Sequence, residues 1–406
     1  MLALGVLATA VPAGYLADRF GIKKCAIASA LPTLVFTVIV YFTRNIYWLC
    51  FARFLTGAAV GGVSVIGPMY MSEISDVALR GTLGSFFEFF IYAGVFFVSV
   101  CGAYVTYRTL TLIIGIFTLV FAVIFLYVPE GPTYLTRMNK HSEAESALRF
   151  YRGHDIDTVE LLKEIQEGIE EKAKRTSSIK KSLMSKGVLR GLVACVGLTI
   201  FQQLSGVDCF ILYAVQIFQA TATSIDAYSS SMIIAAVQTI SAAMAVFIVE
   251  KARRRLLLFI STIGSGICLG VMGAYFHMQE FRIDFPGFRF IPIGSFTIFS
   301  LAFAVGLGPV LWMINGELFP HEIKGVANGI TISTNWIFTF IVTKTFPIAM
   351  VDLGAQYSFY FFAICMAVCI VFIKFCVPET KGKTLEEIQI ELNGRHIYKN
   401  QSDIKM

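Results

Sequence analysis

The sequence predicts an all-α integral membrane protein built of two similar helical lobes. Of its 406 residues, 56% are hydrophobic and only 15% are charged, whereas soluble domains have roughly 25% charged residues. The charges are gathered in short blocks between apolar runs of about 20 residues, the length that crosses a bilayer as a helix. Strands are excluded, because an open sheet edge cannot face lipid.

A short motif with an acidic residue seven positions before a basic one occurs twice and indicates the two lobes. Glu73 precedes Arg80 by seven positions in MSEISDVALRG, and Glu317 precedes Lys324 by seven in NGELFPHEIKG. In both copies a glycine follows the base, and the copies are 244 positions apart (317 − 73). A parallel repeat of this size in an apolar chain is typical of a two-lobed secondary transporter.

The apolar runs predict eleven spans, at about 1–17, 25–43, 47–72, 82–104, 107–128, 188–217, 227–249, 256–276, 291–316, 326–349 and 356–376. We expect four regions: an N-terminal lobe, a cytoplasmic helical linker, a C-terminal lobe and a cytoplasmic tail, at 1–128, 129–187, 188–376 and 377–406. Six spans follow the linker but five precede it. The first half is therefore expected to lack its opening helix, as in an N-terminally truncated form of a twelve-helix protein.

The basic residues follow the predicted topology. Loops on one side of the spans, including the linker and the tail, hold 25 Lys and Arg, whereas loops on the other side hold four. The basic side is expected to be cytoplasmic. The pI of about 8.8 thus reflects membrane topology, and we expect no nucleic-acid partner.

The composition does not favour an enzyme or a metalloprotein. The nine Cys lie mostly within spans and form no CxxC or Cys/His cluster, and the five His are scattered. Buried Cys of this kind are usually small apolar residues. We find no nucleophile–base pair and no nucleotide loop, and we expect no metal and no cofactor.

Acidic and basic residues also pair at the cytoplasmic ends of spans. Asp18 and Arg19 occur in GYLADRFG, and Glu250 and Arg254 in VEKARRR. Positive-inside topology accounts for the bases but not for the acids. A network that holds the lobes together in one state and breaks in the other would form a gate; loop solvation is the alternative. The expected gate residues are Asp18, Arg19, Glu73, Arg80, Glu130, Glu250, Arg254, Glu317, Lys324 and Glu379.

Seven segments resemble, in order, the motifs of the sugar porter family of the major facilitator superfamily. They are GYLADRFG, PMYMSEISDVALRG, PEGPTYL, QQLSGVDCFILYAVQIF, VEKARRR, GPVLWMINGELFPHEIKG and VPETKGKTLEEI. The amino-acid sequence as a whole, including TNWIFTFIVTKTFP, is most similar to insect facilitative trehalose and hexose transporters. The resemblance implies two six-helix lobes, here five and six, that carry a small sugar across the plasma membrane by alternating access.

Polar residues at membrane depth are the candidates for substrate contact. Asn and Gln match sugar hydroxyls because each side chain has a donor end and an acceptor end. Ser205-Gly206 is expected to break the span after Gln202 and Gln203, as in other transporter sites. The resemblance gives these two amides direct roles, although helix–helix hydrogen bonds are the alternative. The expected substrate residues are Gln202, Gln203, Asp208, Tyr213, Gln238, Trp312, Asn335, Trp336, Glu88 and Arg53.

Two acids depart from the family pattern, which has Asn at the position of Asp208 and often Gln at Glu88. Arg53 either pairs with Glu88 and fixes helix packing, or these carboxylates bind a proton that is coupled to sugar movement. The main expectation is facilitative transport. The alternatives are a proton-coupled sugar symporter and a sensor that binds sugar without moving it.

Overall fold

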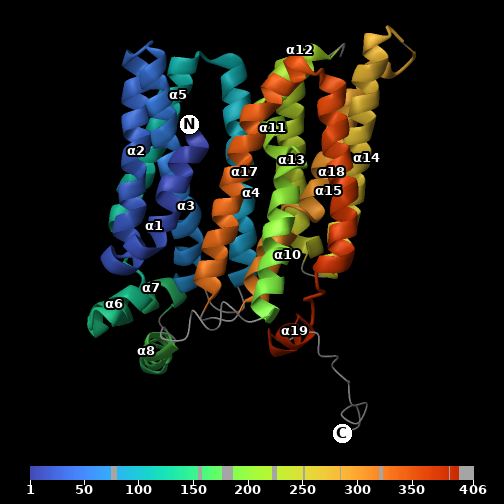
Figure 1. Cartoon of the computed structure of the whole chain (residues 1–406). Helices are drawn as coiled ribbons and strands as arrows, with labels where there is room; N and C mark the ends of the chain where they lie inside the picture. Colours follow the sequence, from blue (N-terminus) through green and yellow to red (C-terminus); the bar gives the residue numbers. More distant parts are fainter. Residues whose placement is uncertain are drawn as a thin grey trace. The chain divides into compact units, whose positions relative to one another are not determined.

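A computed structural model describes residues 1–74, 80–153, 158–175, 186–221, 226–249, 252–283, 285–319, 323–383 and 385–392. Within these ranges every regular element is a helix (Figure 1). The predicted all-α class is confirmed.

The chain divides into two compact units. Unit 1 comprises Met1–Lys174, Asp208–Val246 and Trp336–Thr345. Unit 2 comprises Arg175–Val207, Phe247–Asn335 and Phe346–Met406. The lobe boundaries expected from the sequence stay a prediction.

The first part of unit 1 contains five long helices: α1 (Leu2–Phe20), α2 (Ile22–Phe42), α3 (Ile46–Ile74), α4 (Arg80–Tyr104) and α5 (Tyr107–Tyr127). Glycine lets α1 and α3 approach backbone to backbone. A Cβ on Gly57 would lie 1.9 Å from the carbonyl oxygen of Leu2, and one on Gly5 would lie 2.0 Å from that of Phe54. Such small residues are typical of helix contacts in membranes, where close packing replaces the hydrophobic effect.

The expected linker helices are present as α6 (Pro132–Arg137), α7 (His141–Arg152) and α8 (Thr158–Arg175). Leu135, Ala144 and Ala147 form a small buried core between α6 and α7. The Tyr151 hydroxyl donates to the Pro129 carbonyl at 2.8 Å. This hydrogen bond therefore holds α7 against the end of α5.

Unit 1 also contains most of α11 (Val207–Leu212), together with α12 (Ala214–Ala220), most of α13 (Ala227–Val249) and the middle of α17 (Lys324–Asp352). The break expected at Ser205-Gly206 is confirmed. Helix α10 (Lys186–Gln203) ends immediately before it, and Gly206 has a φ of 76°, which favours glycine. The chain then resumes as α11.

The second broken span lies in unit 2. Its first half is α15 (Ile291–Val305), after the short η2 (Phe288–Phe290), and its second half is α16 (Pro309–Leu318). The Ser261 hydroxyl accepts a hydrogen bond from the Leu307 amide at 3.0 Å, within the break. The stretch Gly306-Leu307-Gly308-Pro309 thus forms the break in this span. The other helices of this unit are α14 (Arg254–Glu280), α18 (Ala355–Cys376) and α19 (Leu385–Leu392).

We expect Gly306→Ala to destabilise the protein by about 1–3 kcal/mol, the usual cost of overpacking. The added Cβ would lie 2.4 Å from both the Leu257 carbonyl oxygen and the Ser261 Cβ, on α14. Gly294→Ala is the matched control, because a Cβ there meets nothing within 4 Å. Thermal unfolding in detergent measures both variants. Equal melting temperatures would contradict the tight approach.

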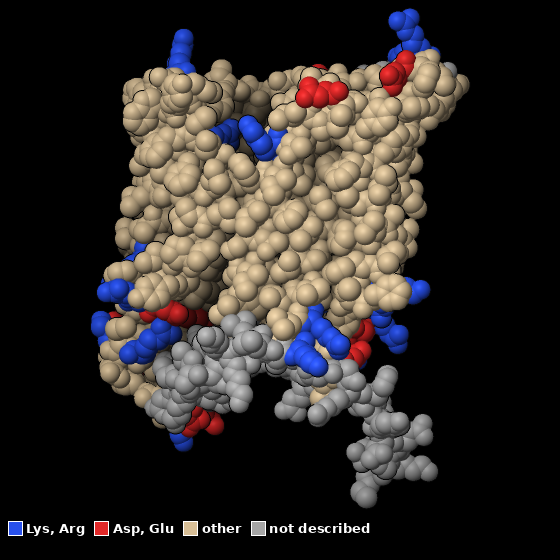
Figure 2. Space-filling model, viewed as in Figure 1, with Lys and Arg blue, Asp and Glu red and all other residues tan. Residues whose placement is uncertain are grey.

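Ten helical segments of the described residues are long and apolar enough to cross a membrane. Helix α1, expected as a further span, is formed but is not among these ten. On the visible face, uncharged residues cover the middle of the surface, and most charged side chains lie near the helix ends (Figure 2). The chain is a multi-pass membrane protein.

Candidate functional site

Gln202, at the end of α10, is fully hydrogen-bonded inside unit 2. Its Nε2 donates to the Leu307 carbonyl at 2.8 Å, and its Oε1 accepts from Asn335 Nδ2 at 3.0 Å. Gln202 and Asn335 are 5% and 7% exposed. This amide therefore joins the break between α15 and α16 to α17.

Gln203 has the same side chain but lacks such partners. It is 4% exposed, and its Oε1 is buried without a hydrogen-bond partner in the described part of the chain. A buried acceptor of this kind costs about 1–3 kcal/mol unless a ligand or water pairs with it. Trp312 of α16, in the same unit, is 37% exposed.

Both acids singled out in the sequence lie in unit 1. The carboxylate of Asp208 on α11 accepts from the Thr339 hydroxyl of α17 at 2.9 Å. Glu88 lies one helical turn before Tyr92 on α4. The Thr239 hydroxyl of α13 donates to the Tyr92 carbonyl at 3.1 Å. Hydrogen bonds therefore join α11 to α17 at Asp208, and α13 to α4 at Tyr92.

Arg53 does not pair with Glu88. The Arg53 side chain is exposed on α3, and no ion pair joins the two residues in the regions that the structure describes. The packing role considered for this pair is not observed. Of the remaining expected substrate residues, Tyr213 donates to the Thr343 carbonyl at 3.0 Å, Trp336 is half-buried and Gln238 is 8% exposed.

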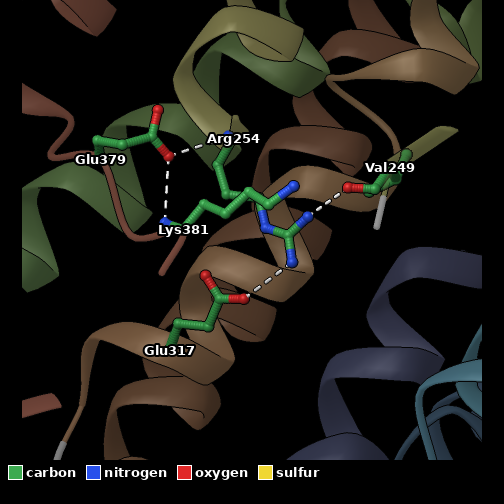
Figure 3. A network of polar contacts seen from close by, with 5 residues as sticks. All are labelled: Val249, Arg254, Glu317, Glu379 and Lys381. Atoms are coloured by element: carbon green, nitrogen blue, oxygen red, sulfur yellow. Dashed lines mark hydrogen bonds and ion pairs between the residues drawn. The ribbon is translucent and has the colours of Figure 1, made fainter. Parts of the chain in front are cut away.

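A network around Arg254 surrounds the start of α14 in unit 2 (Figure 3). Arg254 Nη2 lies 3.3 Å from Glu317 Oε1, with the arginine side chain 10% exposed. The guanidinium also donates to the Val249 carbonyl. The Glu379 carboxylate accepts from the backbone amides of Arg254 and Arg255 at 3.0 and 3.3 Å. It therefore caps the helix N-terminus, where free amides and the helix dipole favour an anion.

The corresponding acid of the first half has the same role in unit 1. Glu130 Oε1 accepts from the Lys23 amide, at the start of α2, at 2.7 Å. It also accepts from its own neighbour, the Gly131 amide, at 3.2 Å. Glu130 and Glu379 were both expected in a gate network, and each accepts hydrogen bonds from backbone amides at a helix start.

Asp18 at the end of α1 pairs with Arg137 of α6, with Oδ1 and Nη1 3.0 Å apart. The same Nη1 donates to the Asp18 carbonyl at 3.1 Å. Arg137 was missed in the sequence because its motif has no counterpart in the other half. Arg19 lies over the Phe20 ring and forms no ion pair among the described residues. Three expected gate groups lie outside the described residues: Glu250 and the side chains of Arg80 and Lys324.

Glu73, beyond the apolar part of α3, is expected to make stability depend on pH. Burial raises the pKa of its carboxyl to about 7; Arg137 opposes this rise, and the nearby acids Glu130 and Asp18 add to it. The folded state then holds a proton that the unfolded state releases above a pH of about 4.5. The contribution of Glu73 to the free energy of unfolding is therefore fully present below that pH and is lost as the pH rises through about 7.

Melting temperatures from pH 4 to pH 8 test this contribution. Wild type should lose stability over the interval, and Glu73→Gln should lose less of it, because the amide does not titrate. Glu143→Gln, a change in an exposed surface pair, is the control and should follow wild type. Parallel curves for all three proteins would contradict the assignment.

Comparisons with known proteins agree with this architecture. Residues 1–392 match the family model described as sugar (and other) transporter. A facilitated trehalose transporter homologue of Drosophila simulans is 30% identical over 97% of this chain and 81% of its own length. A facilitated trehalose transporter of Polypedilum vanderplanki is 32% identical over 97% of this chain and 79% of its own.

Solved structures show the same fold. The proton:xylose symporter XylE, bound to 6-bromo-6-deoxy-D-glucose, is 26% identical and superposes with a TM-score of 0.76. That match covers 96% of this chain and 88% of the other. The xylose transporter XylE from E. coli in an inward-open conformation gives a TM-score of 0.79 at 25% identity, over 96% and 87% of the two chains.

Proposed function

Because this chain belongs to the sugar transporter family, we propose that it carries a small sugar, trehalose or a hexose, across the plasma membrane by facilitative alternating access. The observation that carries the proposal is the family match over residues 1–392. The relatives named as facilitated trehalose transporters support the substrate class. The linker and the C-terminal tail face the cytoplasm in this proposal, because they hold most of the basic residues.

In this proposal Gln203 contributes the principal amide to the sugar, because its buried Oε1 has no other partner among the described residues. Gln202 and Asn335 hold the surrounding backbone in place. Trp312 covers the apolar face of the sugar ring. Asp208, Tyr213, Gln238, Trp336, Glu88 and Arg53 complete the proposed substrate residues.

The ion pairs at the helix ends form the proposed cytoplasmic gate. Arg254–Glu317 and Arg137–Asp18 are its observed pairs. Each pair lies within one unit, so in this proposal it holds helix ends of its own unit in one of the two states, and its loss shifts the balance between outward and inward states. The gate residues expected from the sequence keep this role here.

Proton-coupled symport is the second candidate. It is favoured by Glu88 and Asp208, intramembrane acids that form no ion pair among the described residues. Intramembrane acids of this kind mark proton paths in many transporters. In this alternative the coupled ion is a proton, and the sugar remains the cargo.

Uptake of a sugar panel into proteoliposomes tests both candidates. Facilitative transport predicts saturable uptake at the same rate with and without a pH gradient, and no sugar-driven proton movement. Acceleration by a gradient, with proton flux on adding sugar, would establish symport. Binding without uptake would indicate a sensor. Absence of both uptake and binding for every sugar would overturn the proposed function.

A further inference from the structure

Unit 1 contains a cavity of about 270 Å³ between α4, α11, α12 and α13. Its lining begins at Val95, three residues beyond Tyr92 on α4, and reaches Leu110 at the start of α5 and Tyr228 at the start of α13. Along these helices the cavity therefore extends from just beyond the level of Tyr92 to the helix ends near Tyr104 and Ala227.

Gln238 marks the inner end of this cavity on α13. It is 8% exposed, it lines the cavity, and its side chain forms no hydrogen bond within the described ranges. Its amide atoms are not among the fully buried, unpaired atoms of the described residues, so they lie where a ligand or water can reach them. Its donor and acceptor ends are thus available to whatever enters the cavity.

The other polar groups of the cavity are hydroxyls. Ser99 donates to the Val95 carbonyl at 2.8 Å and Ser231 to the Ala227 carbonyl at 2.9 Å. Because each serine hydroxyl already donates its hydrogen to a carbonyl, only its oxygen remains available, as an acceptor. The remaining wall is mainly apolar, with Phe210 and Ile234 among its residues, and no described lining residue is charged.

This combination fits an uncharged sugar ring. A pyranose has hydroxyls on its edge, which donate to and accept from an amide and donate to serine oxygens, and it has C–H faces that pack on apolar walls. An ionic ligand would find no opposite charge among the described lining residues. A purely hydrocarbon ligand would leave the Gln238 amide unpaired.

The cavity lies next to the acidic cluster of the same unit. Thr239, adjacent to Gln238, is bonded to the Tyr92 carbonyl, and Asp208 is two residues before Phe210 of the cavity wall. A sugar contacting Asp208 and Glu88 would therefore direct its far end into this cavity. We propose that the cavity is the subsite for the second ring of an uncharged disaccharide, an inference that rests on the proposed transport function.

A substitution that narrows the cavity should weaken the binding of disaccharides and leave the binding of hexoses nearly unchanged. Ala235 is 4% exposed and lines the cavity, so Ala235→Leu places an isobutyl group in the second-ring space. We expect trehalose to bind about tenfold or more weakly and glucose to bind within about twofold of wild type. Ala236→Leu is the matched control, because the adjacent alanine does not line the cavity, and it should leave both affinities unchanged.

Gln238 gives an independent variant. Gln238→Leu keeps the approximate volume but removes both hydrogen-bonding ends, and it should weaken trehalose binding by about tenfold, with Gln238→Asn recovering part of the loss. Calorimetric titration of the purified, folded proteins with trehalose, maltose and glucose gives the affinities, and proteoliposome uptake gives the matching KM values.

The outcomes are distinct. If Ala235→Leu weakens trehalose and glucose binding equally, or neither, the second-ring subsite is wrong while sugar transport stands. A copurifying lipid that native mass spectrometry detects in wild type, that Ala235→Leu loses, and that trehalose does not displace would show an acyl-chain site and overturn the proposal. Wild-type protein that binds and transports glucose but not disaccharides would overturn it as well. Loss of all sugar binding and uptake in wild type would overturn the transport function and, with it, this subsite.

Discussion

Replacing Gln203 by leucine is expected to abolish sugar uptake and leave the fold intact, whereas the same replacement at Gln202 is expected to destabilise the protein. The Gln203 Oε1 is buried without a partner among the described residues, so its removal strands no protein group. It also removes an unpaired acceptor, and the folded state should lose little stability. The sugar, however, loses an amide in a dry site, where discrimination of this kind reaches factors of 10⁴ or more.

At Gln202 the main expected effect is on stability rather than on sugar uptake. Leucine would leave the Leu307 carbonyl and the Asn335 amide without their partners. Each stranded buried group costs about 1–3 kcal/mol, so we expect a loss of about 2–6 kcal/mol in the free energy of unfolding.

Thermal unfolding and radiolabelled uptake, measured on the same preparations, separate the two residues. Gln203→Leu should melt near wild type and transport almost nothing, and Gln202→Leu should melt early. The interpretation fails if Gln203→Leu transports normally, or if Gln202→Leu keeps the wild-type melting temperature.

The second large effect is expected at Arg254. Its side chain is 10% exposed and pairs with Glu317, which also has a buried carboxylate oxygen without a partner in the described region. Arg254→Met would leave that carboxylate uncompensated and free the Val249 carbonyl. The Glu317 side chain is 33% exposed, so solvent screens this pair, and we expect a loss of about 1–3 kcal/mol, below the roughly 3–5 kcal/mol that is typical of a fully buried pair.

A double-mutant cycle identifies the pair as the cause. Arg254→Met combined with Glu317→Gln should recover much of the lost stability, because neither charge then remains. The control is Arg149→Met, which removes an exposed pair with Glu145 and should cost about 1 kcal/mol or less. Strictly additive losses in the double variant would refute a direct pair. If the pair also serves as a gate, the double variant should change the ratio of inward to outward transport rates.

The fold was predictable because its signals are long and regular. Apolar runs fix the spans, and Ser205-Gly206 and the GLGP stretch at 306–309 mark the breaks, since glycine and proline interrupt helical hydrogen bonding. The break at Ser205-Gly206 was found where expected. The first predicted span was less certain to cross a membrane, because Asp18 and Arg19 lower the mean hydropathy of α1.

The site was predictable by residue type but not by role. Gln202 and Gln203 are adjacent and chemically identical, and only their environments separate a structural amide from a free one. Arg137 gave no signal, because its partner Asp18 is 119 residues away in the chain and its motif is not repeated. The capping role of Glu379 depends on the position of a helix start. None of these facts is encoded in local spacing.

The hydrogen bond from Gln202 to the Leu307 carbonyl has a consequence for exchange with solvent. It ties the end of α10 to the break between α15 and α16, two segments 105 residues apart. Backbone amides at the two places should therefore not open independently. In deuterium exchange they should behave as one cooperative unit with a common opening free energy, and Gln202→Ala should divide it into two units with different rates.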